Sequence, residues 1–167
     1  MVQNKSAVFL KFPKEFPIPG EHFEIQTKDL HADLKPNSVL LRNLYFSLDP
    51  YMRGRMRDAE SYVPHFQLNQ PMNGYGVAEV IESKNSDFPK GSLVSGTTGW
   101  EQYSVIPEAF AKKLRVLPEN ARTSKTIPLS AWVGVLGMPG FTAYSSLKII
   151  GQPKAGETIF VSAAAGA

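Results

Sequence analysis

The chain of 167 residues contains no cysteine. Without cysteine it can form neither a disulfide bond nor a thiolate nucleophile, nor a cysteine-ligated zinc site. Histidine is scarce too, and the three histidines, His22, His31 and His65, lack the i, i+4 spacing of a helical metal-binding pair. A metal site is therefore not expected.

Long apolar runs and concentrated charge are also missing. No apolar stretch approaches the roughly 20 residues that span a bilayer, and residues 1–6 lack the apolar core of a signal peptide. A cytoplasmic location without membrane contact is the default expectation. The net charge of +3 comes from scattered basic residues, so a nucleic-acid partner is not expected. Only Arg53, Arg55 and Arg57 cluster; they could meet a phosphate, but a solvated face is the simpler interpretation.

Glycine and proline, by contrast, are plentiful and cut the chain into short segments. There are 13 of each, a spacing that favours β structure over a helical bundle. Apolar and β-branched runs predict strands at residues 7–12, 22–27, 39–46, 74–83, 91–96 and 100–106. Six or more short strands within the first 125 residues predict a compact β-barrel or sandwich.

Helical signals are fewer and lie mostly near the end of the chain. Pro50 can open a short helical turn with Asp49 close to a capping position. Residues 127–137 have helix-compatible apolar spacing with Ser130 as a possible cap, and Pro139 is well placed to begin a second helix. Between these regions, residues 58–71 show no period and predict a long loop of the kind that often carries function.

The last twelve residues change character again. Residues 158–161 are β-branched and aromatic and follow Gly156, a good turn residue, so a strand is predicted there. Only small side chains follow, at residues 162–167. Small residues after a strand permit close approach to a phosphate, as in a dinucleotide-binding βαβ unit. That unit also needs a helix and a second strand, which do not follow in this sequence, so a plain small-residue tail is the alternative.

Five motifs, in family order, resemble the zinc-independent medium-chain dehydrogenase/reductases. The resemblance is to the branch of leukotriene dehydrogenases, prostaglandin reductases and plant alkenal double-bond reductases. The matching stretches are NLYFSLDPYMR (43–53), NGYGV (73–77), GWEQYS (99–104), LGMPGFTAY (136–144) and GETIFVSAAAGA (156–167).

The resemblance implies a mainly β chain with helices, an α+β fold built on a GroES-like barrel. Residues 1–125 would form the GroES-like substrate domain and residues 126–155 the connecting helices. Residues 156–167 would form the first strand and the start of the phosphate turn of a truncated Rossmann domain. Family members continue beyond this point with roughly another domain.

The resemblance also implies a reaction and a set of site residues. Similar proteins use NADPH to reduce the C=C bond of α,β-unsaturated aldehydes and ketones, with hydride delivered to the β-carbon and an enolate oxygen held by tyrosine hydroxyls. Tyr51 and Tyr75 would contact the substrate, and the main catalytic tyrosine is expected beyond residue 167. The residues expected at the cofactor are Pro50, Tyr51, Thr142, Ser162, Ala163, Ala164, Ala165, Gly166 and Ala167.

Simpler structural interpretations remain open for individual residues. Tyr51 could be a packed aromatic at the base of a loop, and Tyr75 an edge-strand aromatic that covers apolar surface. His65 is interpreted as a surface residue, whereas Trp100 and Tyr103 are interpreted as core.

Two functions remain for the chain as a whole. It is either the substrate-domain portion of an NADPH-dependent reductase, inactive when isolated and a homodimer in its full-length form, or a non-enzymatic binding module that retains only the barrel.

Overall fold

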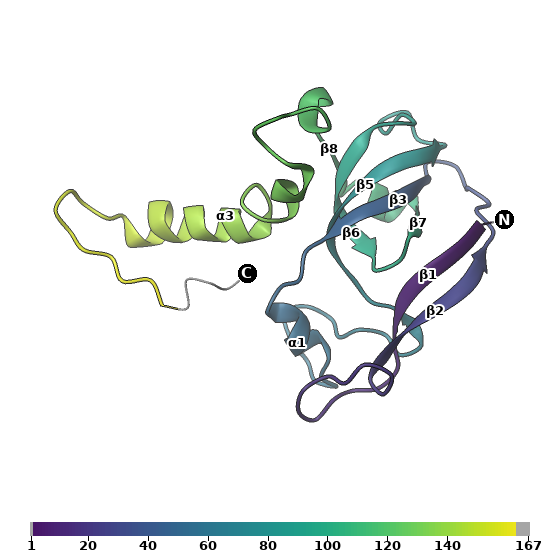
Figure 1. The fold of residues 1–167 in the computed structure, drawn as a ribbon, viewed down its shortest axis with the longest axis horizontal. Helices are drawn as coiled ribbons and strands as arrows, with labels where there is room; N and C mark the ends of the chain where they lie inside the picture. Colours follow the sequence, from purple (N-terminus) through teal and green to yellow (C-terminus); the bar gives the residue numbers. More distant parts are fainter. Residues whose placement is uncertain (1, 163–167) are drawn as a thin grey trace.

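The computed structural model describes residues 2–162, which form eight strands in two antiparallel sheets (Figure 1). The smaller sheet has the order β2-β1-β4, with bounds Phe23–Leu30, Val2–Phe9 and Gln70–Pro71. The larger sheet has the order β7-β3-β5-β6-β8, with bounds Tyr103–Ile106, Val39–Phe46, Asn73–Ser83, Leu93–Gly99 and Arg115–Val116. The predicted mainly β, α+β fold is therefore confirmed.

Strand β1 joins the two sheets. The amide of Ala7 donates to the carbonyl of Trp100 at 2.8 Å, and the amide of Gln102 donates to the carbonyl of Lys5 at 2.9 Å. These bonds lie just before β7, so the middle strand of the small sheet is hydrogen-bonded to the segment that leads into an edge strand of the large sheet. The result is a partly closed barrel rather than two separate sheets.

Both faces of the large sheet are covered by apolar side chains. On one face, buried residues of β3, β5 and β6 meet Ala111 of helix α2 (Glu108–Ala111). On the other face, Val77 packs with Leu117 and Ala121, the last from the 3₁₀ turn η1 (Glu119–Ala121). A third cluster lies between the small sheet and helix α1 (Tyr51–Arg55), with Phe9 and Met52 among its members.

The first strand begins earlier than predicted. It spans Val2–Phe9 rather than 7–12, with Val2 paired to Leu30 and Phe9 to Phe23. Its polar residues are stabilised by side-chain bonds, since the amide of Asn4 donates to the carbonyl of Tyr103 at 2.9 Å. Hydropathy missed this half of the strand because its inward-facing residues are polar.

Helix α1 begins where Pro50 predicted, but Asp49 does not cap it. The N-cap is Pro50, and no side chain bonds the free amides of the first turn. Asp49 is instead buried, and one of its carboxylate oxygens accepts a hydrogen bond from Ser47 at 3.0 Å.

The C-terminal helices extend away from the sheets (Figure 1). The helix expected at 127–137 is only a 3₁₀ turn, η2 (Leu129–Val133), and Ser130 makes no capping bond. It ends at Gly134, whose ψ of −107° leaves the helical region. The second helix forms as predicted, as α3 (Met138–Ser145) with Pro139 in its first turn, and continues in the π-type turn η3 (Ser146–Gly151).

Glycine is needed where α3 begins. A Cβ atom on Gly140 would lie 1.8 Å from the carbonyl oxygen of Val135, so only glycine lets the first turn of the helix approach this backbone. None of the helices within residues 2–162 is long and apolar enough to cross a membrane.

The strand predicted at residues 158–161 is not formed. Residues 157–161 make no ladder with any described strand, and their side chains are exposed. A strand is stabilised by pairing with a neighbour, so β propensity alone does not create one. Of the expected phosphate turn, Ser162 is exposed, whereas residues 163–167 lie outside the described part of the chain.

Candidate functional site

A cavity of about 350 Å³ opens between α1, the loop that follows it, the large sheet and the start of α3. Five separate segments contribute to its wall, so it exists only in the folded chain. Its lining residues are Tyr51, Arg55, Tyr62, Val63, Asn73, Gly74, Thr97 and Met138.

Tyr51 supplies one of the hydroxyl groups of this cavity, beside those of Tyr62 and Thr97. It is the first residue of α1 and is half-buried against the cluster that contains Phe9. Burial raises the pKa of the Tyr51 phenol, and the charge of Asp49 raises it further, whereas Arg55 opposes both. The phenol is therefore a neutral hydrogen-bond donor at physiological pH, the state needed to hold a developing oxyanion.

Arg55 stands beside this phenol and is fixed in place. Its Nε donates to the carbonyl of Pro64 and one terminal nitrogen donates to the carbonyl of Asn73, both at 2.9 Å. The guanidinium carbon also lies 4.1 Å from the centroid of the Phe66 ring. Burial lowers the pKa of Arg55, and the Tyr51 oxygen acts in the opposite direction.

The three clustered arginines do not form one solvated face. Arg53 donates to the carbonyl of Glu15 and so fixes the loop after β1, and Arg55 is held as described. Only Arg57 is exposed. Pro50 and Tyr51 also line a second hollow of about 330 Å³ between α1 and the loop after it, together with Ser61, Tyr62 and Val63.

Tyr75 is placed differently from Tyr51. It lies in β5, an interior strand of the large sheet and not an edge, and its hydroxyl donates to Ser95 at 3.0 Å. It is not among the residues that line the cavity, although its cross-strand partner Thr97 is.

The glycines beside Tyr75 have a packing role. Neighbours in a strand point to the opposite face, so Gly74 and Gly76 do not uncover Tyr75. A Cβ on Gly74 would lie 2.5 Å from the side chain of Met52, and one on Gly76 would lie 2.9 Å from the carbonyl oxygen of Tyr45. Gly76 is therefore required by close approach of the backbone, whereas at Gly74 the terminal methyl group of Met52 would have to move.

Of the other predicted cofactor residues, those that the structure describes (Pro50, Thr142 and Ser162) do not line the cavity. Thr142 is exposed on α3, one helical turn beyond Met138, and Ser162 is exposed at the end of the described chain. Residues 163–167 are not described. Within residues 2–162 no group of three or more histidine, aspartate or glutamate side chains could hold a metal ion.

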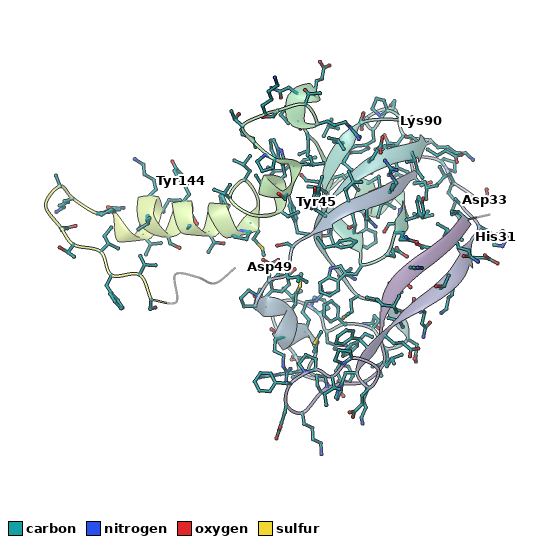
Figure 2. The ribbon with its side chains drawn as sticks, in the orientation of Figure 1. His31, Asp33, Tyr45, Asp49, Lys90 and Tyr144 are labelled. Carbon is teal, nitrogen blue, oxygen red and sulfur yellow. The ribbon has the colours of Figure 1, made fainter. Side chains whose placement is uncertain are left out.

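Ser47 and Asp49 lie in the connection between β3 and α1 and link it to the C-terminal segment, residues 122–162. The Ser47 hydroxyl lies 3.0 Å from a carboxylate oxygen of Asp49 and 3.2 Å from the carbonyl oxygen of Val133. The other carboxylate oxygen of Asp49 is buried and has no partner within the described residues. Figure 2 shows Asp49 next to α1 on the side from which α3 extends, whereas Tyr144 lies farther out on α3.

Several cavity residues were not found by sequence reasoning. Tyr62 and Val63 lie in the loop predicted to be functional, but no pattern singled them out; Thr97 and Met138 lie within or beside recognised motifs. His65 is half-buried, with its ring 5.4 Å from that of Phe12, rather than a plain surface residue. Trp100 and Tyr103, both predicted as core, are only partly buried, and Trp100 packs against the cluster of Phe9.

A larger, open hollow of about 510 Å³ lies elsewhere, between β1 and β3. Ile25, Tyr45 and Leu48 supply its apolar wall, and Glu101 lies at one side. None of the predicted site residues lines it, so the smaller cavity at Tyr51 is the better candidate.

Comparison with known proteins identifies the family. Residues 5–114 match a family described as the N-terminal domain of oxidoreductase. The chain is 44% identical to the NADP(+)-dependent 2-alkenal reductase of Nicotiana tabacum, over 99% of this chain and 47% of that protein. It is 43% identical to the NADPH-dependent curcumin reductase of Escherichia coli, over 98% of this chain and 45% of that protein.

Solved structures agree with this result. CurA from Vibrio vulnificus, which is also known in complex with NADPH, superposes with a TM-score of 0.75 at 35% identity, over 90% of this chain and 42% of CurA. The chain spans about half the length of the relatives it matches. It belongs to this family of oxidoreductase N-terminal domains and matches the N-terminal half of medium-chain dehydrogenase/reductases such as the 2-alkenal and curcumin reductases.

Proposed function

We propose that the chain is the substrate-domain portion of an NADPH-dependent reductase of the C=C bond of α,β-unsaturated aldehydes and ketones. The observation that carries the proposal is the neutral phenol of Tyr51 at the wall of a cavity, in a chain 44% identical to a 2-alkenal reductase. The chain's similarity to NADP-dependent oxidoreductases supports this proposal.

The chemistry requires a donor at the carbonyl oxygen. When hydride reaches the β-carbon, the electron pair of the C=C bond moves toward the carbonyl, and negative charge develops on its oxygen. A phenol that is already positioned and neutral stabilises this charge without a metal. We assign this donor role to Tyr51 and a second substrate contact to Tyr75.

The described residues suit one end of the cofactor. NADPH, when bound, supplies the hydride. Tyr51 lines the cavity together with Thr97 and Met138, so apolar and hydroxyl groups are available there to contact the nicotinamide ring. Pro50, the preceding residue, lines the second hollow. Thr142 and residues 162–167 would serve the rest of the cofactor.

Fixing a dinucleotide requires a phosphate turn followed by a helix. The 167-residue chain lacks that helix, so we propose that it binds NADPH weakly or not at all and has no useful activity alone. Incubation of the purified chain with NADPH and an enal, followed at the NADPH absorbance, should show no consumption. Measurable turnover would disprove this part of the proposal, and fluorescence titration with NADPH measures any residual binding.

The tyrosines are tested in the full-length reductase. Tyr51→Phe should lower kcat/KM for an enal by about 10²-fold, the usual effect of losing one oxyanion donor. Tyr75→Phe should cause a smaller loss, because its hydroxyl already donates to Ser95. Tyr45→Phe, which changes an exposed tyrosine away from the cavity, is the matched control. Unchanged kinetics with Tyr51→Phe and Tyr75→Phe would remove both from the site.

The competing function is a non-enzymatic binding module. The length of the natural product separates the two: an intact mass of the natural protein near twice that of this chain supports the reductase. We further propose that the full-length reductase is a cytoplasmic homodimer, which light scattering and cell fractionation would test.

A further inference from the structure

Helix α1 carries a second polar side chain that the proposed chemistry does not use. Arg55 follows Tyr51 by four residues, a spacing that places both side chains on the same face of a helix. Both side chains line the 350 Å³ cavity. A guanidinium and a phenol therefore line the same partly open cavity, although nothing in the reaction chemistry requires a cation there.

The guanidinium is held from three directions. The carbonyls of Pro64 and Asn73 each accept a hydrogen bond from it, and the ring of Phe66 lies against its plane. Pro64 and Phe66 belong to the loop after α1, whereas Asn73 opens β5, so the loop, helix and sheet all converge on this one group. A guanidinium has five N–H donors, and these two bonds leave donors for the phenol.

We propose that Arg55 is a positioning residue for Tyr51, donating a hydrogen bond to the phenol oxygen so that the phenol directs its own hydrogen toward the substrate carbonyl. This inference rests on the proposed reductase function. A hydroxyl group has a single hydrogen and two acceptor sites. Once Arg55 occupies an acceptor site, the O–H bond of Tyr51 turns away from the cation and into the cavity.

The cation also strengthens the donor. A positive charge beside the phenol oxygen favours the transfer of electron density onto it, so the O–H group binds a developing enolate oxygen more strongly. In agreement, Arg55 lowers the pKa of Tyr51 against the larger effect of burial. The other groups that act on the phenol are Asp49, from the loop before α1, and Tyr62, from the loop after it, and both raise the pKa.

A different role for the same side chain would be a direct contact with an anionic group of the substrate. The two roles predict different effects on kcat and KM when the substrate is uncharged. A positioning residue acts on kcat even for an uncharged enal, whereas an anion-binding residue acts on KM and only for a charged substrate.

The first experiment measures the phenol directly and needs no activity. The chain is labelled with ¹³C at the Cζ of tyrosine, Tyr51 is assigned from the spectrum of Tyr51→Phe, and the titration is followed into alkaline pH. Arg55→Gln should raise the pKa of Tyr51, and Arg55→Lys should raise it less. Arg57→Gln removes the same charge from an exposed position near the same helix, so it should change Tyr51 less than Arg55→Gln does.

The second experiment measures turnover of a neutral enal by the full-length reductase. Arg55→Gln should lower kcat by about tenfold with little change in KM, the scale of an indirect loss of oxyanion stabilisation. Arg55→Lys should recover part of kcat. Circular dichroism checks folding, and if Arg55→Gln does not fold, Arg55→Lys carries the comparison.

The outcomes separate this inference from the proposed function. A Tyr51 pKa that does not respond to either Arg55 variant overturns the positioning role, as does an effect on KM alone. If the wild-type reductase does not reduce enals while the Tyr51 pKa still responds, the reductase function fails and the pairing of Arg55 with Tyr51 stands.

Discussion

The barrel and the C-terminal segment are built from similar amino acids but reach opposite degrees of burial. Residues 2–121 contain three clusters of buried apolar side chains. From residue 122 to residue 162, only Gly137 is buried. Phe9 of the barrel is completely buried, whereas Phe160 remains 90% exposed. The difference shows that local helical signals suffice to shape α3, but that burial of its apolar side chains requires packing against other elements, as α1 and α2 pack against the sheets.

The exposed apolar side chains of the C-terminal segment agree with the proposed function. Phe141, Tyr144 and Ile150 of this segment are exposed together, and exposed apolar surface of this kind is typical of an interaction surface.

The largest expected contrast between the two regions is one of stability. Phe9→Ala removes a ring that packs 5.3 Å from Phe12 and 5.8 Å from Phe66. It should lower the free energy of unfolding by about 3–5 kcal/mol, the usual cost of a cavity in a core. Phe160→Ala should change it by less than about 0.5 kcal/mol. Urea denaturation measures both, and equal losses would show that the C-terminal segment is part of the same core.

A pair of glycines tests the junction with α3. Gly140→Ala places a methyl group against the Val135 carbonyl, so the first turn of α3 should lose about 1–3 kcal/mol, the usual cost of overpacking. Amide hydrogen exchange should accelerate in α3 and η3 while the barrel amides remain protected. Gly54→Ala, in open space within α1, should instead stabilise the chain by about 0.5–1 kcal/mol. Equal behaviour of the two variants would contradict the close contact at Gly140.

The smallest expected effect is a pH dependence confined to the barrel. Burial raises the pKa of the Glu101 carboxyl, partly offset by hydrogen bonds from Ser104 and Asn4. Because the folded pKa exceeds the unfolded value of about 4.3, the penalty for charging Glu101 is absent below that value and complete above the folded pKa. Stability from this group therefore falls as pH rises through that window.

Glu101→Gln should remove this dependence. The difference in unfolding free energy between wild type and variant, measured in urea from pH 4 to pH 7, should shift in favour of the variant as pH rises. Parallel curves for the two proteins would show that Glu101 does not contribute to the pH dependence. The wild-type protein, measured at the same pH values, is the reference for the variant.

The sequence predicted strands most accurately where an apolar run also pairs with neighbouring strands in the folded chain. The strand at 39–46 was predicted with its observed bounds, because its apolar residues are central to the barrel. The strand predicted at 158–161 failed because hydropathy does not reveal whether a partner strand is present. The short elements α2 and β8 were not predicted, since four and two residues are too few to show a period.

The candidate site was only partly visible in the sequence. Tyr51 follows from its motif, but the importance of Arg55 depends on the Pro64 and Asn73 carbonyls, which lie 9 and 18 residues away. Backbone carbonyls carry no sequence signature, so no motif could have indicated that Arg55 is immobilised. The same reasoning explains why Tyr62 escaped notice, since its place at the cavity depends on the path of a loop.

The hydroxyl of Ser47 gives the boundary between the two regions an unusual property. It has one hydrogen but two acceptors within reach, the Asp49 carboxylate and the Val133 carbonyl. If Val133 moves away with the C-terminal segment, Asp49 is the remaining acceptor for the Ser47 hydroxyl, and Asp49 lies two residues before Tyr51. The orientation of the Ser47 O–H bond thus depends on whether η2 contacts the barrel. Ser47 lies in the short connection between β3 and α1, so this orientation is coupled to the position of α1.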